Sequence, residues 1–206
     1  MPTLWIGSNN QKKLVELTRL LTPLGVELRT PKDLDGPFDP VEDQPDFAGN
    51  ARKKATLLAE MAGAVALADD SGLCVDAMNG RPGVHSARYG GPGLDDRGRL
   101  LKLLEELRGV PHAQRTARFV CHLCVAAPDG TVLAGIERSC EGVLRAEPSG
   151  DGGFGYDPIF VPVEYQNDMS QSFAVLGDDV KDGLSHRGKA LRELVTVLPQ
   201  ILDETR

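Results

Sequence analysis

Residues 3–21 read TLWIGSNNQKKLVELTRLL, and this stretch indicates an α/β fold. The apolar run at 3–7 ends at a glycine and is typical of a buried strand. The next three residues, SNN, are types that cap helices. Leucines then recur at helical spacing until a proline and a glycine, Pro23 and Gly25, end the helix. The chain therefore begins with a strand, a polar turn and a helix.

The rest of the chain extends this pattern into a mixed sheet. The spacing of apolar residues predicts helices over 47–61, 95–108 and 186–202, and strands over 26–30 and 65–68. The turn sequence Pro128-Asp129-Gly130 joins two longer predicted strands into an antiparallel hairpin, 117–127 and 131–145. Alternating elements followed by a hairpin favour a mixed α/β sheet. With no repeat and no clear linker, we expect residues 1–206 to form a single domain.

Composition and charge exclude several classes of protein. A formal net charge of -7 disfavours non-specific nucleic-acid binding, because duplex phosphates would be repelled. No apolar stretch approaches the roughly 20 residues of a membrane helix. The first residues, MPTLWIGSNN, lack the basic and apolar regions of a signal peptide. We therefore expect a cytoplasmic protein that contacts neither membranes nor nucleic acid.

Cys121 and Cys124 form a CxxC pattern, which could indicate a zinc or redox site. The surrounding residues are typical of a strand, however, and residues three apart on a strand point to opposite faces. The two thiols would not converge. The sequence favours packing over metal binding at these cysteines.

The turn between the first strand and helix offers groups that suit phosphate. A helix N-terminus presents backbone N–H groups and a positive dipole end, and Ser8, Asn10 and Lys13 add donors or charge. The alternative is a simple helix cap followed by surface lysines.

Ala68-Asp69-Asp70-Ser71-Gly72 is predicted at the end of a strand, where ligands of α/β folds bind. Adjacent carboxylates repel each other unless a cation lies near, and Mg²⁺ prefers such oxygen ligands. Glu42, in an acidic loop, could complete a metal site with Asp70. The alternative is an exposed turn, because DDSG is also good turn chemistry.

Two later segments could recognise a base. Gly152 to Pro158 places Phe154 and Tyr156 in a glycine-rich loop, where an aromatic face can stack on a nucleobase. Lys181 and the sequence SHRGK at 185–189 are predicted to open the last helix, where positive charge opposes the helix dipole. The alternatives are core aromatics and a solvated basic turn.

Five segments together resemble the inosine triphosphate pyrophosphatase (Ham1-like) family. They are SNNQKK, FAGNARKKA, ADDSGLCVDAMNGRPGVHSARYGG, GGFGYDPIF and LSHRGKAL, in that order, and they span nearly the whole chain. The resemblance implies a two-lobed α/β fold on a long twisted mixed sheet flanked by helices, with the active site in the cleft between lobes. It also implies a homodimer and hydrolysis of ITP, dITP and XTP to the monophosphate and pyrophosphate.

The resemblance also implies roles for particular residues. Glu42 and Asp70 would bind Mg²⁺, and Asp70 would accept the proton of the attacking water with support from Asp69. The substrate-binding residues implied are Ser8, Asn9, Asn10, Gln11, Lys12, Lys13, Lys54, Ser71, Phe154, Gly155, Tyr156, Asp157, Lys181, His186 and Arg187.

One position departs from the family pattern. Many members have Glu before the Asn of the FxENAxxKA segment, and here Gly49 stands there. If that Glu assists the metal in relatives, Glu42 and the aspartates must suffice in this chain.

Two other functions compete with this one. A pyrophosphatase for other modified nucleotides would differ in its substrates, which a substrate panel resolves. A non-catalytic nucleotide sensor would have little need for a general base, and Asp69 and Asp70 speak against it.

Overall fold

The computed structural model describes residues 2–205, which form two compact units. Unit 1 holds the chain up to Asp70, Cys121–Arg138 and the chain from Gly188 onward. Unit 2 holds Ser71–Val120 and Ser139–Arg187. Each unit is thus assembled from segments that are distant in sequence.

The strands form one six-stranded sheet in the order β2-β1-β3-β4-β5-β6. Their bounds are β1 Thr3–Gly7, β2 Glu27–Arg29, β3 Ala66–Val75, β4 Thr116–Ala126, β5 Val132–Leu144 and β6 Phe160–Pro162. Strand β1 pairs in parallel with β2 and β3, whereas β5 and β6 are antiparallel. The predicted mixed sheet is confirmed. Only the three-residue strand β6 was not predicted, because it is too short to show a period.

The predicted helices are also present, with ends shifted by one to a few residues. They are α1 Gln11–Leu21, α2 Phe47–Ala62, α3 Asp96–Glu106 and α5 His186–Glu204, and a further short helix, α4 Asp178–Leu184, was not predicted. The side chains of Asn10, Asp46 and Asp95 cap α1, α2 and α3. Helix α2 ends at Gly63, whose left-handed conformation (φ 59°) a glycine adopts without strain.

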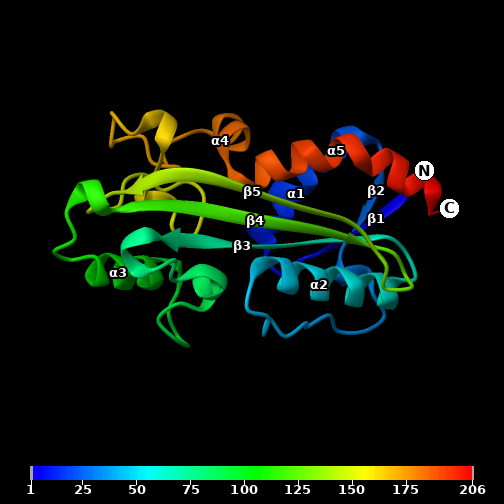
Figure 1. The fold of residues 1–206 in the computed structure, drawn as a ribbon. Coiled ribbons are helices and arrows are strands. Elements are labelled where there is room, and N and C mark those ends of the chain that lie inside the picture. The colour runs from blue at the N-terminus through cyan, green and yellow to red at the C-terminus, as the bar shows by residue number, and fades with distance from the viewer. Residues whose placement is uncertain (1, 206) are drawn as a thin grey trace. The chain divides into compact units, whose positions relative to one another are not determined.

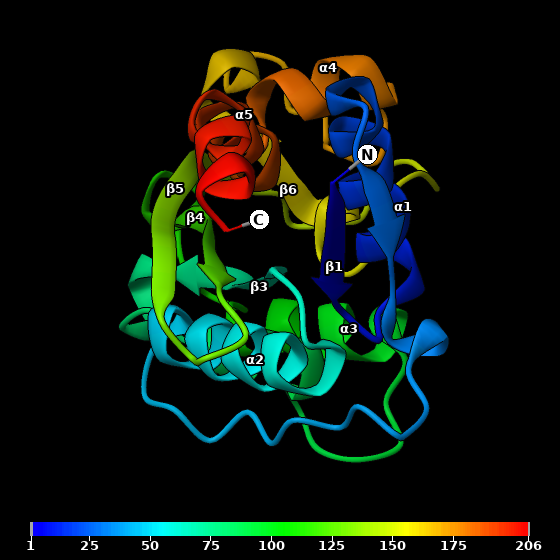
Figure 2. The same cartoon turned by 90° about the vertical axis from the view of Figure 1, so that its right-hand side faces the viewer.

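In unit 1, helices cover both faces of the strands (Figures 1 and 2). Helices α1 and α5 pack on one face with Leu4, Ile6 and Leu67, and α2 packs on the other with Trp5, Ala66 and Ala68. The strand period of two separates these sets, because successive side chains point to opposite faces. Both faces are therefore buried, as expected for parallel strands.

The cysteines follow the same alternation. Cys121 belongs to the cluster of α1 and α5, and Cys124 belongs to the cluster of α2. The prediction that the two thiols lie on opposite faces is confirmed, and they share no site.

Unit 2 has a core built around α3 and the outer strands. Leu100, Leu103 and Leu107 pack with apolar residues of β3, β4 and β5. Three aromatic rings, Phe119, Phe160 and Phe173, lie with centroids 4.7 to 6.2 Å apart. This packing supports the segment from which the glycine-rich loop 152–158 departs.

Two sequence predictions are wrong in detail. Strand β3 continues to Val75, so Asp69-Asp70-Ser71-Gly72 lies within a strand and not at its end. The sequence resembles a turn, but both aspartates are buried, and lysines pair with them inside the strand. Lys181 lies in the short helix α4 and not at the start of α5, because Ser185 ends α4 first.

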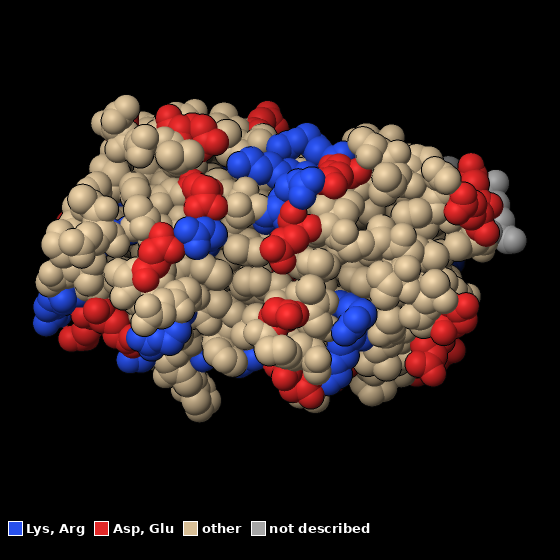
Figure 3. Space-filling model, in the orientation of Figure 1, with Lys and Arg blue, Asp and Glu red and all other residues tan. Residues whose placement is uncertain are grey.

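Within residues 2–205, every helix is too short or too polar to cross a membrane. Basic and acidic side chains are interspersed on the face shown in Figure 3. On that face, several basic side chains gather near the upper centre of the view, with acidic side chains beside them.

Candidate functional site

Polar residues surround the start of α1, as the sequence predicts. Asn10 accepts hydrogen bonds from the backbone N–H groups of Lys12 and Lys13, and Ser8 Oγ accepts one from the Asn10 N–H. Asn9 donates from its side chain to the carbonyl of Phe38 at 2.8 Å. The helix cap of the alternative interpretation is therefore present, and a phosphate at the Lys12 or Lys13 N–H would share these donors with Asn10.

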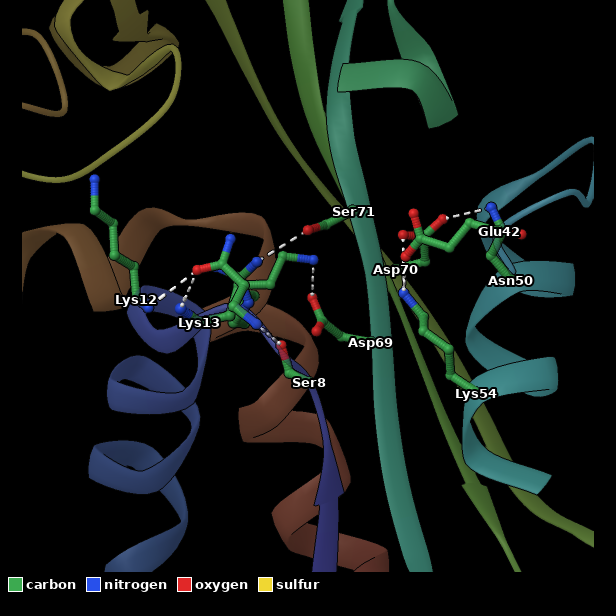
Figure 4. Close-up of polar contacts among 11 residues, drawn as sticks. Ser8, Lys12, Lys13, Glu42, Asn50, Lys54, Asp69, Asp70 and Ser71 are labelled. Carbon is green, nitrogen blue, oxygen red and sulfur yellow. Dashed lines mark hydrogen bonds and ion pairs between the residues drawn. The ribbon is translucent and has the colours of Figure 1, made fainter. Parts of the chain in front are cut away.

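Strand β3 sends its two aspartates to opposite faces (Figure 4). Asp69 faces α1, where Lys13 Nζ lies 3.0 Å from its Oδ2. Asp70 faces α2, where Lys54 Nζ lies 3.2 Å from its Oδ1. The carboxylates are 1% and 5% exposed, so each buried charge is offset by a separate lysine. The repulsion expected between adjacent carboxylates is reduced in two ways, because strand alternation separates the two side chains and each has a lysine beside it.

Asp70 is held at both of its oxygens. Asn50 Nδ2 donates to Oδ2 at 3.0 Å, and Lys54 contacts Oδ1. Burial raises the pKa of Asp70 above its usual value, although Lys54 and Lys13 oppose the shift. A carboxylate with a raised pKa is a better proton acceptor than an ordinary surface aspartate.

Lys54 also brings Glu42 to the same place. Its Nζ lies 2.7 Å from Glu42 Oε1, so one ammonium group joins Glu42 to Asp70. Burial alone would lower the pKa of Lys54, but the carboxylates of Asp70, Asp69 and Glu42 outweigh it and raise that pKa. Glu42 and Asp70 thus lie around one positive charge, and their binding of a metal stays a prediction.

This donor set fits a hard divalent cation. Two carboxylates already converge on the ammonium of Lys54, and carboxylate oxygens are the ligands that Mg²⁺ prefers. Among residues 2–205, no cluster of three or more His, Cys, Asp or Glu side chains forms a complete cage. Mg²⁺ usually keeps several waters and binds substrate phosphates as well, so two protein carboxylates suffice.

The glycine-rich loop of unit 2 is organised around Asp157. Its carboxylate is 4% exposed, accepts a bond from the Phe154 N–H at 2.8 Å, and pairs with Lys181 Nζ at 2.9 Å. The loop can only bend this closely with glycine at 153, because a Cβ there would lie 2.1 Å from Asp157 Oδ2. Asp157 and Lys181 therefore hold the loop in shape.

The two loop aromatics differ in exposure. Tyr156 is buried and donates to the carbonyl of Ser86 at 3.0 Å, so it packs in the core. Phe154 is half-buried, and Lys181 Nζ and the Arg187 guanidinium lie 5.0 and 5.9 Å from its ring centroid. Phe154 is the aromatic face in this loop that remains partly accessible.

His186 and Arg187 are the first two residues of α5. His186 stacks on Phe119 with centroids 4.9 Å apart, and Arg187 donates to Ser71 Oγ at 2.9 Å. They are 6% and 2% exposed. Both side chains are therefore buried, unlike the solvated basic turn of the alternative interpretation. Ser71, Phe154, Lys181 and Arg187 are thus linked within unit 2.

Sequence reasoning missed two polar residues that support these groups. Asn50 is 1% exposed in α2, and its signal was its helical spacing of four from Lys54. Asp96 in α3 accepts a bond from the Gly155 N–H at 3.2 Å, and only the folded unit brings these segments together.

Comparison with known proteins identifies the family of this chain. Residues 4–197 match the model of the Ham1 family. A dITP/XTP pyrophosphatase of Desulforamulus reducens is 46% identical over 95% of both chains. One from Rhodopirellula baltica is 45% identical over 96% of this chain and 91% of its own.

Solved structures give the same answer. A HAM1 protein from Coxiella burnetii has a TM-score of 0.85 and 37% identity, covering 97% of this chain and all (100%) of its own. A nucleoside-triphosphatase / dITP/XTP pyrophosphatase from Mycobacterium abscessus has a TM-score of 0.75 and 39% identity, with coverage of 93% and 98%. The resemblance carried by the five segments is confirmed, and this chain belongs to the Ham1 family.

Proposed function

We propose that this chain hydrolyses the non-standard purine nucleoside triphosphates ITP, dITP and XTP to the nucleoside monophosphate and pyrophosphate. The observation that carries the proposal is the buried Asp70 carboxylate, fixed by Asn50 and joined through Lys54 to Glu42. Relatives that match nearly the whole chain bear the name dITP/XTP pyrophosphatase. Removing such nucleotides would cleanse the nucleotide pool.

The triphosphate would bind at the start of α1 and at Lys54. Phosphoryl transfer depends on positioning and on neutralising charge, which Lys13, Lys54 and the helix N-terminus can supply. Ser8 to Lys13 form this binding segment in our proposal. Both lysines already pair with carboxylates, so the site is built to hold positive charge close to Asp69 and Asp70.

Asp70 would accept the proton of the attacking water, and Asp69 would fix Lys13. Mg²⁺, held by Glu42 and Asp70, would neutralise phosphate charge and lower the pKa of bound water. A positioned general base contributes typically about 10²–10⁴-fold in rate. The burial that raises the pKa of Asp70 suits this role.

Phe154 would stack on the purine, while Ser71, Gly155, Lys181, His186 and Arg187 line or support the base site. Donors on His186 or Arg187 would bond the 6-oxygen of hypoxanthine or xanthine. Adenine presents an amino donor there, and an unsatisfied buried donor costs about 1–3 kcal/mol. The base would therefore be selected by hydrogen-bond matching.

We further propose a cytoplasmic homodimer that binds no nucleic acid and no membrane. The proposed substrates belong to the nucleotide pool, and the net charge of -7 would repel duplex phosphates. Sedimentation equilibrium would give about twice the chain mass of 22.1 kDa. A single species at the chain mass would contradict the dimer.

A substrate panel tests the function. Pyrophosphate release is measured from ITP, XTP, dITP, GTP and ATP, with Mg²⁺ and with EDTA. We expect turnover of the first three with Mg²⁺, little of GTP and ATP, and none with EDTA. Binding of these nucleotides without turnover would favour the sensor instead.

A further inference from the structure

The loop that carries Glu42 is attached to α2 at two points one helical turn apart. Glu42 pairs with Lys54, and the backbone N–H of Gln44 donates to Asn50 Oδ1 at 3.0 Å. Asn50 and Lys54 are four residues apart, so they lie on the same stripe of the helix. The loop therefore lies against the helix stripe that also faces Asp70.

Asn50 makes a different bond with each end of its amide. The Gln44 N–H can only donate, so it needs the carbonyl oxygen of Asn50. The Asp70 carboxylate accepts, so it needs the amide nitrogen, which lies 3.0 Å from Oδ2. The two partners together define the orientation of this amide, and both ends of the side chain are used.

Gly49 makes this approach possible. A Cβ at position 49 would lie 2.7 Å from the Cβ of Gln44, closer than real Cβ atoms come. A side chain at 49 would push Gln44 away and lengthen its bond to Asn50. The glycine that departs from the family pattern thus belongs to the same contact.

We propose that Asn50 is a positioning residue that sets the separation and orientation of Glu42 and Asp70 for the metal. It bonds the Asp70 carboxylate directly and holds the Glu42 loop through Gln44. This role rests on the proposed function of Glu42 and Asp70. Loss of a group that orients a metal ligand typically lowers metal affinity or activity by about 10–100-fold.

The test compares Asn50→Ala with Asp46→Ala in the full chain. Asp46 caps the same first turn of α2, with its Oδ1 2.7 Å from the Gly49 N–H, and it is exposed, whereas Asn50 is buried against Asp70. It is the matched control for lost helix stability. The probe is Mn²⁺ alone, a hard cation whose free electron paramagnetic resonance signal falls on binding.

We expect Asn50→Ala to weaken Mn²⁺ binding, and the Mg²⁺ concentration for half-maximal turnover to rise, by roughly 10–100-fold. The KM for ITP at saturating Mg²⁺ should change by less than about threefold, because Asn50 would not touch the nucleotide. Asp46→Ala should keep the parent's metal affinity. Parent metal affinity in folded Asn50→Ala, or an equal loss in Asp46→Ala, would overturn the proposal.

If Asn50→Ala does not fold, Asn50→Asp replaces it, since it keeps the size and the acceptor for Gln44. Its oxygen cannot donate to Asp70, so kcat should fall at least about tenfold at saturating Mg²⁺ and ITP, with KM little changed. Parent kcat in this variant would overturn the role of Asn50. Absence of pyrophosphate release by the parent protein would count instead against the proposed function.

Discussion

Asp69 and Asp70 occupy different surroundings although they are adjacent in sequence. Asp69 is paired with Lys13 from α1, and Asp70 with Lys54 and Asn50 from α2. Strand alternation alone separates them. The two carboxylates have different direct partners, so their roles can be tested by separate mutations.

Asp70→Asn should lower turnover of ITP by about 10²–10⁴-fold, because the amide cannot accept the proton of water. The amide has the same shape, so nucleotide binding should persist. The measurement is kcat beside the dissociation constant of a non-hydrolysable ITP analogue. Asp76→Asn, at a surface pair with Arg118, is the control and should retain parent turnover. Parent turnover in Asp70→Asn would remove Asp70 from the mechanism.

Sequence motifs could predict which residues matter but not which of them meet. The pairing of Glu42 with Asp70 through Lys54 depends on a loop, a helix and a strand brought together by folding. The spacing of four residues predicts that Asn50 and Lys54 share one side of a helix, but not that this side is buried. The role of Asn50 depends on burial, which the helical period alone does not reveal.

In strand β4, the reactivity of two cysteines reports whether their side chains are buried on opposite faces. Cys121 and Cys124 are 0% and 2% exposed on opposite faces. Burial raises the pKa of Cys124 to about 11, so at pH 8 only roughly one thiol in a thousand is ionised. We expect Ellman's reagent at pH 8 to leave both unmodified in the native chain and to modify them on unfolding. Rapid native modification of Cys124 would contradict this packing.

Strand β5 contains two glycines that differ in the space around them. A Cβ at Gly142 would lie 2.4 Å from the Val161 carbonyl oxygen of β6, whereas at Gly135 the nearest atom is 3.4 Å away, on His122. Gly142→Ala should therefore cost about 1–3 kcal/mol of unfolding free energy. Gly135→Ala should stay within about 0.5 kcal/mol of the parent.

The measurement is urea unfolding of both variants beside the parent. A lower midpoint for Gly142→Ala alone is expected, because only there must the two paired strands separate. Equal midpoints for all three proteins would show that β5 and β6 are not in this close contact.

Helices and long strands were predictable because their hydrophobic periods are strong, as in α1 and the β4–β5 hairpin. The length of β3 could not be predicted, because the sequence DDSG is typical of a turn. In the folded chain Lys13 and Lys54 offset the charge of its two aspartates, so these residues lie within the strand. The short helix α4 was also hidden, because its seven residues, DDVKDGL, show no apolar stripe.

On the scale of the whole molecule, the net negative charge acts on large polyanions, whereas the lysines of the candidate site act on a small ligand. The net charge of -7 disfavours polyanions in general, while Lys54 is buried and Lys13 is partly buried, each beside a carboxylate. A small nucleotide carrying a metal could reach such groups, whereas a duplex would be repelled.

The most direct measurement of the central claim is phosphorus NMR of the products formed from ITP and Mg²⁺. We expect IMP and pyrophosphate in equal amounts, and formation of both about 10²–10⁴-fold slower in the Asp70→Asn variant. Formation of IDP and inorganic phosphate would contradict a pyrophosphatase. Bound but unchanged ITP would contradict catalysis itself and leave a nucleotide sensor on this fold.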